Sequence, residues 1–262
     1  MLTAQGVTKR YPGGAEALRG IDLTLRKGAA TGLVGASGCG KSTLARILAR
    51  LEKPDSGRVE LYGVAVSRRE YHRRVQIIFQ DSCGALDPRA DVAGLLFEPI
   101  ENFIRPPRSE RRDIANGLLR NVGLGEELLT RYPHQLSGGQ RQRVAIARAL
   151  AADPEYLICD EAVSSLDADM RDVILDLIGG LCRERGMGCL FITHDIASAA
   201  RICGDVRVML DGRIVDGLSA DNIASGPAHP YTRELRAYAF ELGKYCRREN
   251  IPGAKGAKFG GA

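Results

Sequence analysis

The sequence lacks an apolar stretch long enough to cross a membrane. Its longest apolar segments, such as VAIARALAA, are interrupted by arginine, whereas a membrane-spanning helix needs about 20 consecutive, mostly apolar residues. The first residues, MLTAQGVTKRYPGG, also lack the apolar core of a secretory signal peptide. We therefore expect a cytosolic chain, although such a chain can still dock on a membrane protein.

Cysteine pairs are absent as well. The seven cysteines occur singly, and no two of them form a C-x-x-C pair. Disulfides are rare in the reducing cytosol, and zinc sites usually place their cysteines in such pairs. We expect the cysteines to be small buried apolar residues, including Cys39 and Cys159, which lie inside the motifs described below.

A strong charge of either sign is also missing. The net charge is +5 over 262 residues, with 44% hydrophobic and 26% charged residues, which supports a packed core. The small positive excess indicates an ordinary surface with a basic tail, and nucleic-acid binding is the less favoured alternative. No internal repeat is visible, so the length predicts one large domain, or one domain with a small appendage.

Two patterns of apolar residues predict two kinds of strand. Near the N-terminus apolar and polar residues alternate between glycine turns, which is typical of an antiparallel layer. Four short and almost continuous apolar runs follow, which is typical of buried parallel strands. The alternating positions are Leu18, Ile21, Leu23, Leu25, Val59 and Leu61, and the continuous runs are TGLVG, QIIFQ, YLICD and CLFIT.

Helices are predicted between these strands. The segment KSTLARILARL places its apolar residues on one helix face. These residues are Leu44, Ile47, Leu48 and Leu51. The segments FEPIENF, IANGLLRNVGL and EELLTRYP are helical in character and carry no strand signal. They predict a helical insertion between QIIFQ and YLICD, within a helical subdomain of about residues 90–150.

A hairpin and a tail are expected at the end of the fold. DVRVMLDGRIVDG predicts two strands joined at Asp211-Gly212, a favoured hairpin turn. Residues 1–240 are expected to form the ordered domain. Residues 241–262 are expected to be a basic flexible tail, because the last dozen are rich in glycine, alanine and lysine.

The segment GASGCGKST predicts a phosphate-binding loop. It matches G-x-x-x-x-G-K-[ST] between the strand TGLVG and a helix, which is the context that the motif requires. Its backbone N–H groups and the helix N-terminus would surround the phosphates. Lys41 would reach the β- and γ-phosphates, Ser42 would bind Mg²⁺, and Thr43 would contact the α-phosphate. The expected nucleotide-binding residues of this loop are Gly35, Ala36, Ser37, Gly38, Cys39, Gly40, Lys41, Ser42 and Thr43.

A carboxylate pair follows the run YLIC. Beside a phosphate-binding loop, Asp160 is expected to bind Mg²⁺ through water. Glu161 is expected to polarise the attacking water as general base, a form of help that contributes roughly 10²–10⁴ in rate.

Three further residues are assigned to the same site. Gln80 ends QIIFQ and would reach Mg²⁺ and the attacking water, and His194 ends CLFITH and would bond the γ-phosphate. Tyr11, in KRYPGG, is expected to stack on adenine, with packing inside its loop as the alternative. The other histidines, His72, His134 and His229, are expected to be structural.

A second glycine pair precedes the helix VAIARAL. Ser137-Gly138-Gly139-Gln140 matches a capping box, S-x-x-Q, which would satisfy the free N–H groups of the helix. The box does not explain the glycines, which lower helix stability unless something approaches the backbone closely. No lysine or metal-binding carboxylate stands beside it, so we expect this loop to be presented to the ATP of another protomer.

The whole set, in order and spacing, resembles the nucleotide-binding subunit of an ABC transporter over about residues 1–240. Tyr11 resembles the A-loop, Gly35–Thr43 the Walker A motif, and Gln80 the Q-loop. Leu136–Gln140 resembles the signature motif, and Tyr156–Glu161 the Walker B strand. Ser164–Asp167 (SSLD) resembles the D-loop, with Asp167 at the nucleotide, and His194 the H-switch.

This resemblance implies an α/β fold with a RecA-like parallel-sheet core, an N-terminal antiparallel β subdomain and a helical insertion. It implies an active ATPase using ATP and Mg²⁺, in which two cassettes face head to tail and each ATP lies between Walker A of one and LSGGQ of the other. The implied partners are a second ABC ATPase subunit (a paralogue or a second copy), two membrane permeases and a periplasmic or surface substrate-binding protein, without nucleic acid. The chain would then lie peripherally on the cytoplasmic face of the cell's inner membrane.

Segments in and around these motifs indicate a particular subfamily of ABC transporter ATPases. FQDSCGALDPR, YPHQLSGGQRQR, DEAVSSLD and HPYTRELR resemble the ATPases of peptide and nickel importers. Four segments look most like the second ATPase subunit of nickel importers, which implies nickel or metal-chelate uptake. They are SGCGKSTLARILARLEKP, FQDS, DEAVSSLD and CLFITHD.

Other functions stay open. HPYTRELR is shared with oligopeptide and dipeptide importers, so peptide import is the first alternative, and the ABC ATPase of a soluble phosphonate-degrading complex is the second. A chromosome or DNA-repair ATPase is disfavoured, because the cassette is not split by a coiled coil or a zinc module.

Overall fold

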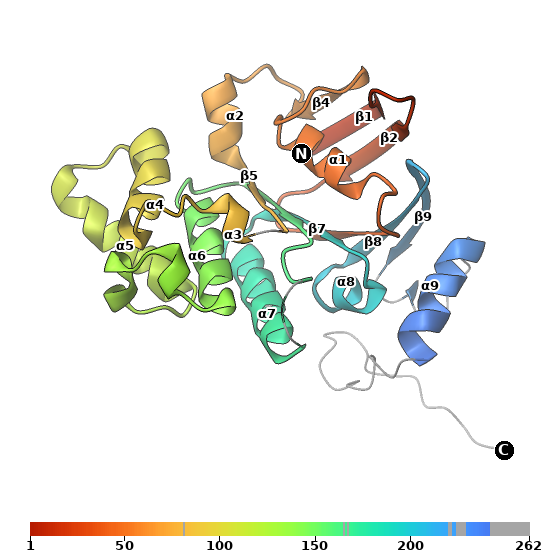
Figure 1. The fold of residues 1–262 in the computed structure, drawn as a ribbon. Coiled ribbons are helices and arrows are strands. Elements are labelled where there is room, and N and C mark those ends of the chain that lie inside the picture. The colour runs from red at the N-terminus through yellow and green to blue at the C-terminus, as the bar shows by residue number, and fades with distance from the viewer. Residues whose placement is uncertain (81, 165, 167, 220–221, 224–228, 242–262) are drawn as a thin grey trace.

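Two β-sheets organise the chain, for which the computed structural model describes residues 1–80, 82–164, 166, 168–219, 222–223 and 229–241. One sheet is antiparallel with the order β2–β1–β4, and the other has the order β5–β6–β7–β3–β8–β9 (Figure 1). The strands are β1 (Leu2–Arg10), β2 (Glu16–Leu25), β3 (Ala30–Val34), β4 (Ser56–Leu61), β5 (Val75–Ile78), β6 (Tyr156–Asp160), β7 (Gly188–Thr193), β8 (Asp205–Leu210) and β9 (Arg213–Ser219).

The larger sheet is parallel from β5 to β8, and β9 pairs with β8 antiparallel. Its central strands are buried on both faces. In β6, Tyr156 and Ile158 belong to the core shared with the antiparallel sheet, whereas Leu157 and Cys159 belong to the core on the other face. This double burial explains the continuous apolar runs, and both predicted kinds of strand are confirmed.

Helices cover the larger sheet and form a separate block beside it. They are α1 (Lys41–Leu48), α2 (Arg68–Arg74), α3 (Ser82–Ala85), α4 (Val92–Pro99), α5 (Arg111–Asn121), α6 (Gly138–Leu150), α7 (Ala168–Arg185), α8 (Ile196–Ile202) and α9 (Pro230–Glu241). A π-helical turn follows at Ile100–Ile104, and 3₁₀ turns lie at Arg108–Glu110, Glu126–Thr130 and Pro133–Gln135. Helix α1 packs between the two sheets, and residues of α6, α7 and α8 fill the core on the opposite face of the larger sheet.

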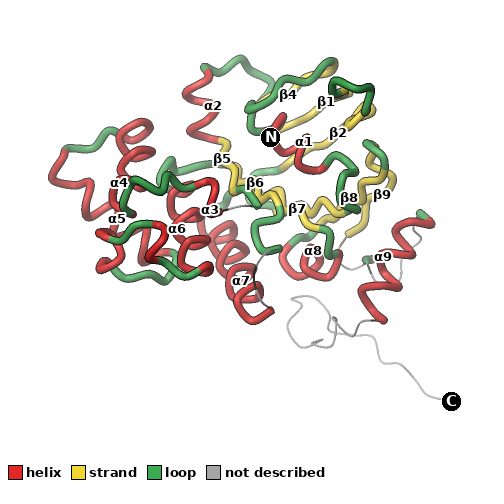
Figure 2. The backbone as a smooth tube through the Cα atoms, in the orientation of Figure 1, coloured by secondary structure: helices red, strands yellow, loops and turns green. Residues whose placement is uncertain are grey.

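The predicted helical insertion is confirmed. The chain leaves the larger sheet after β5 and returns at β6, and helices and loops alone fill the described residues between them (Figure 2). Helix α6 packs on α4, on α5 and on β5, so it joins this block to the sheet.

The first helix is shorter than its apolar pattern predicts. Helix α1 ends at Leu48, and Leu51, which was expected on its buried face, is 51% exposed. Arg50 has a left-handed backbone (φ 54), and Leu51 N–H bonds to Arg46 C=O at 2.9 Å. This is a Schellman-type ending, which turns the chain away before Leu51 reaches the core.

Smaller predictions are resolved as well. Asp211 and Gly212 have positive φ and join β8 to β9, as expected. The cysteines whose surroundings are described are free and buried. They are Cys39, Cys159, Cys182, Cys189 and Cys203. Residues 242–262 lie outside the described residues, so the domain boundary and the tail stay predictions. No described helix is both long and apolar enough to cross a membrane.

Candidate nucleotide-binding and active site

The loop between β3 and α1 has the shape of an anion cradle. A Cβ atom at Gly35 would lie 2.3 Å from Met209 C=O, and one at Gly40 would lie 2.3 Å from Ala17 C=O, so both positions require glycine. Gly40 precedes α1 without a side-chain cap. The N–H groups of the first helical turn therefore lack a side-chain cap and face a position that favours negative charge.

Lys41 lies at the mouth of this cradle with its side chain only 3% exposed. Its ammonium group donates hydrogen bonds to Gly35 C=O at 2.8 Å and to Ala36 C=O at 2.9 Å. The same nitrogen lies 3.8 Å from a carboxylate oxygen of Glu161. The lysine is thus held by the loop and beside the carboxylate pair of β6.

Ser42 and Asp160 form a small oxygen cluster next to the lysine. The Ser42 hydroxyl donates to Asp160 Oδ1 at 3.0 Å, and Asp160 is 5% exposed. Burial raises the pKa of Asp160, Ser42's hydrogen bond opposes that change, and the charge of Glu161 adds to it. A buried carboxylate beside a hydroxyl fits a divalent cation, because Mg²⁺ prefers hard oxygen ligands and its charge would offset the cost of burial.

Glu161 stands between the lysine and the end of the next strand. Its backbone is left-handed (φ 49), and its N–H bonds to Ile192 C=O at 3.0 Å. Its second carboxylate oxygen lies 3.9 Å from Nδ1 of His194, whose side chain is 58% exposed. A non-glycine residue in this backbone region costs roughly 1–3 kcal/mol and often marks a functional site.

Two expected members are not placed in this cluster. β5 ends at Ile78, so Gln80 lies two residues beyond the strand, is exposed, and makes no described hydrogen bond to the residues above. Asp167 lies outside the described residues. The roles given to both stay predictions.

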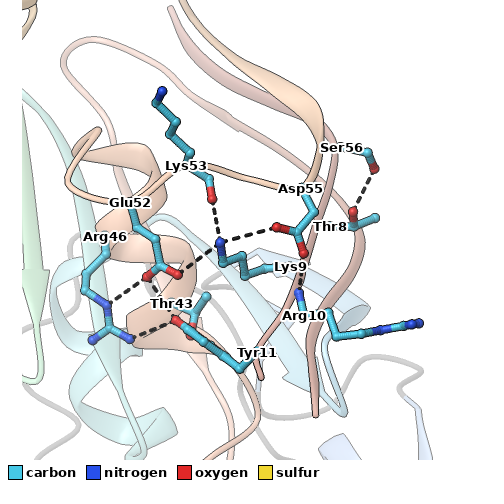
Figure 3. Close-up of polar contacts among 10 residues, drawn as sticks. All are labelled: Thr8, Lys9, Arg10, Tyr11, Thr43, Arg46, Glu52, Lys53, Asp55 and Ser56. Atoms are coloured by element: carbon cyan, nitrogen blue, oxygen red, sulfur yellow. Dashed lines mark hydrogen bonds and ion pairs between the residues drawn. The ribbon is translucent and has the colours of Figure 1, made fainter. Parts of the chain in front are cut away.

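Tyr11 lies beside α1 in a polar network (Figure 3). Its hydroxyl donates to Glu52 at 2.9 Å, lies 3.3 Å from the Thr43 hydroxyl and accepts from Arg46 at 3.4 Å. Glu52 is also paired with Lys9 at 3.4 Å. The tyrosine is therefore next to the phosphate loop. Stacking on adenine and the alternative, packing inside its own loop, both stay predictions.

The second glycine pair begins α6, and its capping box is confirmed. Gln140 N–H bonds to the Ser137 hydroxyl at 3.2 Å, and Ser137 N–H bonds to the Gln140 side chain at 2.9 Å. A Cβ at Gly138 would meet nothing within 4 Å, and the atoms nearest to one at Gly139 would belong to the flexible Met170 side chain. Packing within the chain thus does not require Gly138. No hydrogen bond between described residues joins this loop to the phosphate loop.

Two contacts of the site were not expected. Glu52 follows α1 in a loop without a motif, and nothing in its sequence signals a partner at Tyr11. Tyr231 accepts a hydrogen bond from Ala36 N–H at 2.8 Å across 195 positions. Its segment, HPYTRELR, was noticed only as a marker of family, which is the one signal that could have found it.

Comparisons with known proteins find relatives over most of the chain. The family model described as "ABC transporter" matches residues 18–164. The probable peptide ABC transporter ATP-binding protein y4tS of Sinorhizobium fredii is 42% identical over 91% of this chain and 72% of its own length. The dipeptide transport ATP-binding protein DppF of Escherichia coli is 39% identical over 90% and 72%. The oligopeptide transport ATP-binding protein OppF of Bacillus subtilis is 40% identical over 85% and 76%.

Solved structures show the same fold. The dimeric post-hydrolysis state of the ATP-binding cassette MJ0796, bound to ADP and Pi, is 30% identical with a TM-score of 0.75, over 84% of this chain and 99% of that one. cbiO1 from Clostridium perfringens, part of the complex cbiONQ, is 28% identical with a TM-score of 0.76, over 93% and 97%. The chain therefore belongs to the ABC transporter family and is an ATPase built on that family's cassette fold.

Proposed function

We propose that this chain binds and hydrolyses ATP to power an importer of the peptide and nickel group, with a peptide as the favoured cargo. The observation that carries the ATPase site is the meeting of three strand ends. Lys41 follows β3, Asp160 ends β6 with Glu161 directly after it, and His194 follows β7. In open parallel sheets, ligands bind at this carboxyl edge.

Each residue of the site then has one task. The phosphate loop surrounds the phosphates of ATP, and Lys41 pairs with their charge. Ser42 and Asp160, together with Gln80, would hold Mg²⁺, which neutralises charge developing on the β- and γ-phosphate oxygens. Glu161 takes a proton from the attacking water, and His194 holds the γ-phosphate. Tyr11 would leave its contact with Thr43 to cover the adenine.

A second cassette completes the site. Ser137–Gln140 and Asp167 would face the ATP of a partner ATPase subunit, which is a copy of this chain or a paralogue. The open space at Gly138 supports this arrangement, because a phosphate group can approach a helix N-terminus closely only where no side chain intervenes. MJ0796, whose solved structures are described as dimeric, offers a template for it.

A cleft between β5 and the helical block supports docking on a membrane subunit. Its volume is about 410 Å³, and Phe79 and Leu51, both exposed, are among its lining residues. Glu98 and Arg148 form an ion pair of 2.8 Å on its wall. We propose that a segment of a membrane permease enters here, with a substrate-binding protein outside the cell and the chain on the cytoplasmic face of the membrane.

The relatives favour peptide as cargo over nickel. Those reported above are named for peptide, dipeptide or oligopeptide transport. Nickel is suggested by short segments alone, such as SGCGKSTLARILARLEKP, and the relatives give it no support.

Replacing Lys41 by alanine tests the ATP site. Hydrogen bonds to charged groups contribute about 1.5–3 kcal/mol, so we expect ATP affinity to fall at least about tenfold. Binding of a fluorescent ATP analogue to the full chain measures this. Lys27→Ala is the control, since Lys27 is exposed and pairs with Glu155 away from the loop. Unchanged affinity in Lys41→Ala would exclude the assigned site.

Uptake measurements test the cargo. In the host organism, chromosomal Lys41→Ala is expected to abolish uptake of a radiolabelled short peptide and to leave nickel uptake unchanged. Loss of nickel uptake alone would favour the nickel importer. Purification of the chain without any permease would favour the phosphonate-degrading complex.

A further inference from the structure

The segment HPYTRELR places a tyrosine against the phosphate loop. It runs from His229 into α9, which packs on α8 at one end of the described chain (Figure 1). Tyr231, in the first turn of α9, turns its hydroxyl to the loop and accepts the hydrogen bond from Ala36 N–H at 2.8 Å. Burial raises the pKa of Tyr231, although the bond from Ala36 opposes that change, so the hydroxyl stays protonated at neutral pH.

The bonded N–H belongs to the same peptide group as the carbonyl that holds the lysine. Gly35 C=O and Ala36 N–H are the two ends of one planar unit. Lys41 donates to the carbonyl end at 2.8 Å, and Tyr231 accepts from the N–H end. Rotation of this peptide would break both bonds. Bonds at its two ends also polarise each other, which strengthens the carbonyl as an acceptor for the ammonium group.

A half-buried carboxylate anchors the residues on either side of Tyr231. One carboxylate oxygen of Asp216, on β9, accepts from His229 N–H at 2.8 Å and from the Thr232 hydroxyl at 2.9 Å. Burial alone would raise the pKa of Asp216, but these bonds outweigh it and the pKa is lowered. Thr232 is fully buried. Since Asp216 holds the residues next to Tyr231, the tyrosine has little freedom to leave the loop.

We propose that Tyr231 is a positioning residue for ATP binding, which sets the place of Lys41 through the Gly35–Ala36 peptide group. Asp216 acts through Tyr231 as its anchor. The C-terminal helix is thereby part of the nucleotide site, and any displacement of α9 changes how firmly the lysine is held. This inference rests on the proposed role of Lys41 in binding ATP.

Replacing Tyr231 by phenylalanine removes only the hydroxyl. We expect the KM for ATP to rise about 2- to 10-fold, as for loss of one ordinary hydrogen bond, and kcat to stay within about twofold. The full chain is used, with membrane subunits where hydrolysis requires them, and the melting temperature without nucleotide is recorded. Tyr62→Phe is the control, because it removes a hydroxyl that bonds Glu155 far from the loop. An unchanged KM in Tyr231→Phe would overturn the proposal.

A double substitution separates positioning from general stability. If Asp216 acts through Tyr231, Asp216→Ala raises the KM for ATP in the native chain and adds nothing in Tyr231→Phe. Additive effects would mean that Asp216 only stabilises the fold, and would overturn the proposed coupling.

The variant Lys41→Ala distinguishes failure of the Tyr231 proposal from failure of the proposed ATP site. If Lys41→Ala keeps its ATP affinity, the site assignment fails. If Lys41→Ala loses affinity and Tyr231→Phe does not, the role of Tyr231 alone fails.

Discussion

Replacing Glu161 by glutamine is expected to lower ATP turnover by a factor of about 10²–10⁴ without weakening ATP binding. Glutamine has the same size, so it can keep the contacts of the site, but it cannot take a proton from water. It also removes a negative charge 3.8 Å from Lys41. With this charge gone, the site repels the phosphates of ATP less, so binding is not weakened. Phosphate release measures turnover, and a fluorescent nucleotide measures affinity.

The control variant is Glu60→Gln. Glu60, on β4, forms an ion pair with Arg58 at 3.0 Å and makes no described contact with the site. This variant is expected to turn over normally. Should Glu161→Gln retain more than about a tenth of the native rate, another residue must act as the base.

Replacing Ser137 by arginine is expected to reduce hydrolysis to background while the isolated chain binds ATP normally. The serine is exposed at the start of α6, beside the open space at Gly138. An arginine there would fill the place that a partner's phosphate must reach, yet it lies outside the chain's own phosphate loop. Hydrolysis at concentrations that support pairing measures the effect, and nucleotide binding is measured on the same sample.

The arginine also removes a helix cap, which costs about 0.5–2 kcal/mol. Ser67→Arg is matched to it, because Ser67 caps α2 through a bond from Glu70 N–H of the same 3.2 Å length. That variant is expected to hydrolyse ATP. Mixing Ser137→Arg with Glu161→Gln is expected to restore part of the rate, since one composite site then has two intact halves. Full activity of Ser137→Arg alone would contradict a role for this loop in the partner's site.

Several residues of the site could be predicted because the sequence motifs lie at the carboxyl ends of predicted strands. Lys41, Asp160, Glu161 and His194 each follow a short apolar run, and parallel pairing brings such ends to one edge. The helical insertion was predictable because a long stretch between QIIFQ and YLICD has segments of helical character and no strand pattern.

The ends of α1 and β5 and the contacts between distant segments depend on backbone geometry, which the spacing of apolar residues does not determine. Leu51 continues the apolar pattern of α1, but a left-handed Arg50 turns the chain before it. Gln80 was expected to end its strand, but β5 ends at Ile78, so Gln80 lies two residues beyond it and makes no described hydrogen bond to the cluster. Hydrophobic periodicity does not predict contacts between distant segments, such as those of Glu52 with Tyr11 and of Tyr231 with Ala36.

The double burial of β6 and β7 ties the halves of the molecule together. Within β7, Leu190 and Ile192 fill one core while Cys189 and Phe191 fill the other. If either core opens, one face of β6 and β7 loses its packing. The strands are then held less firmly, which destabilises the core on their other face. The antiparallel sheet and the helices beneath the parallel sheet should therefore melt cooperatively, as a single foldon.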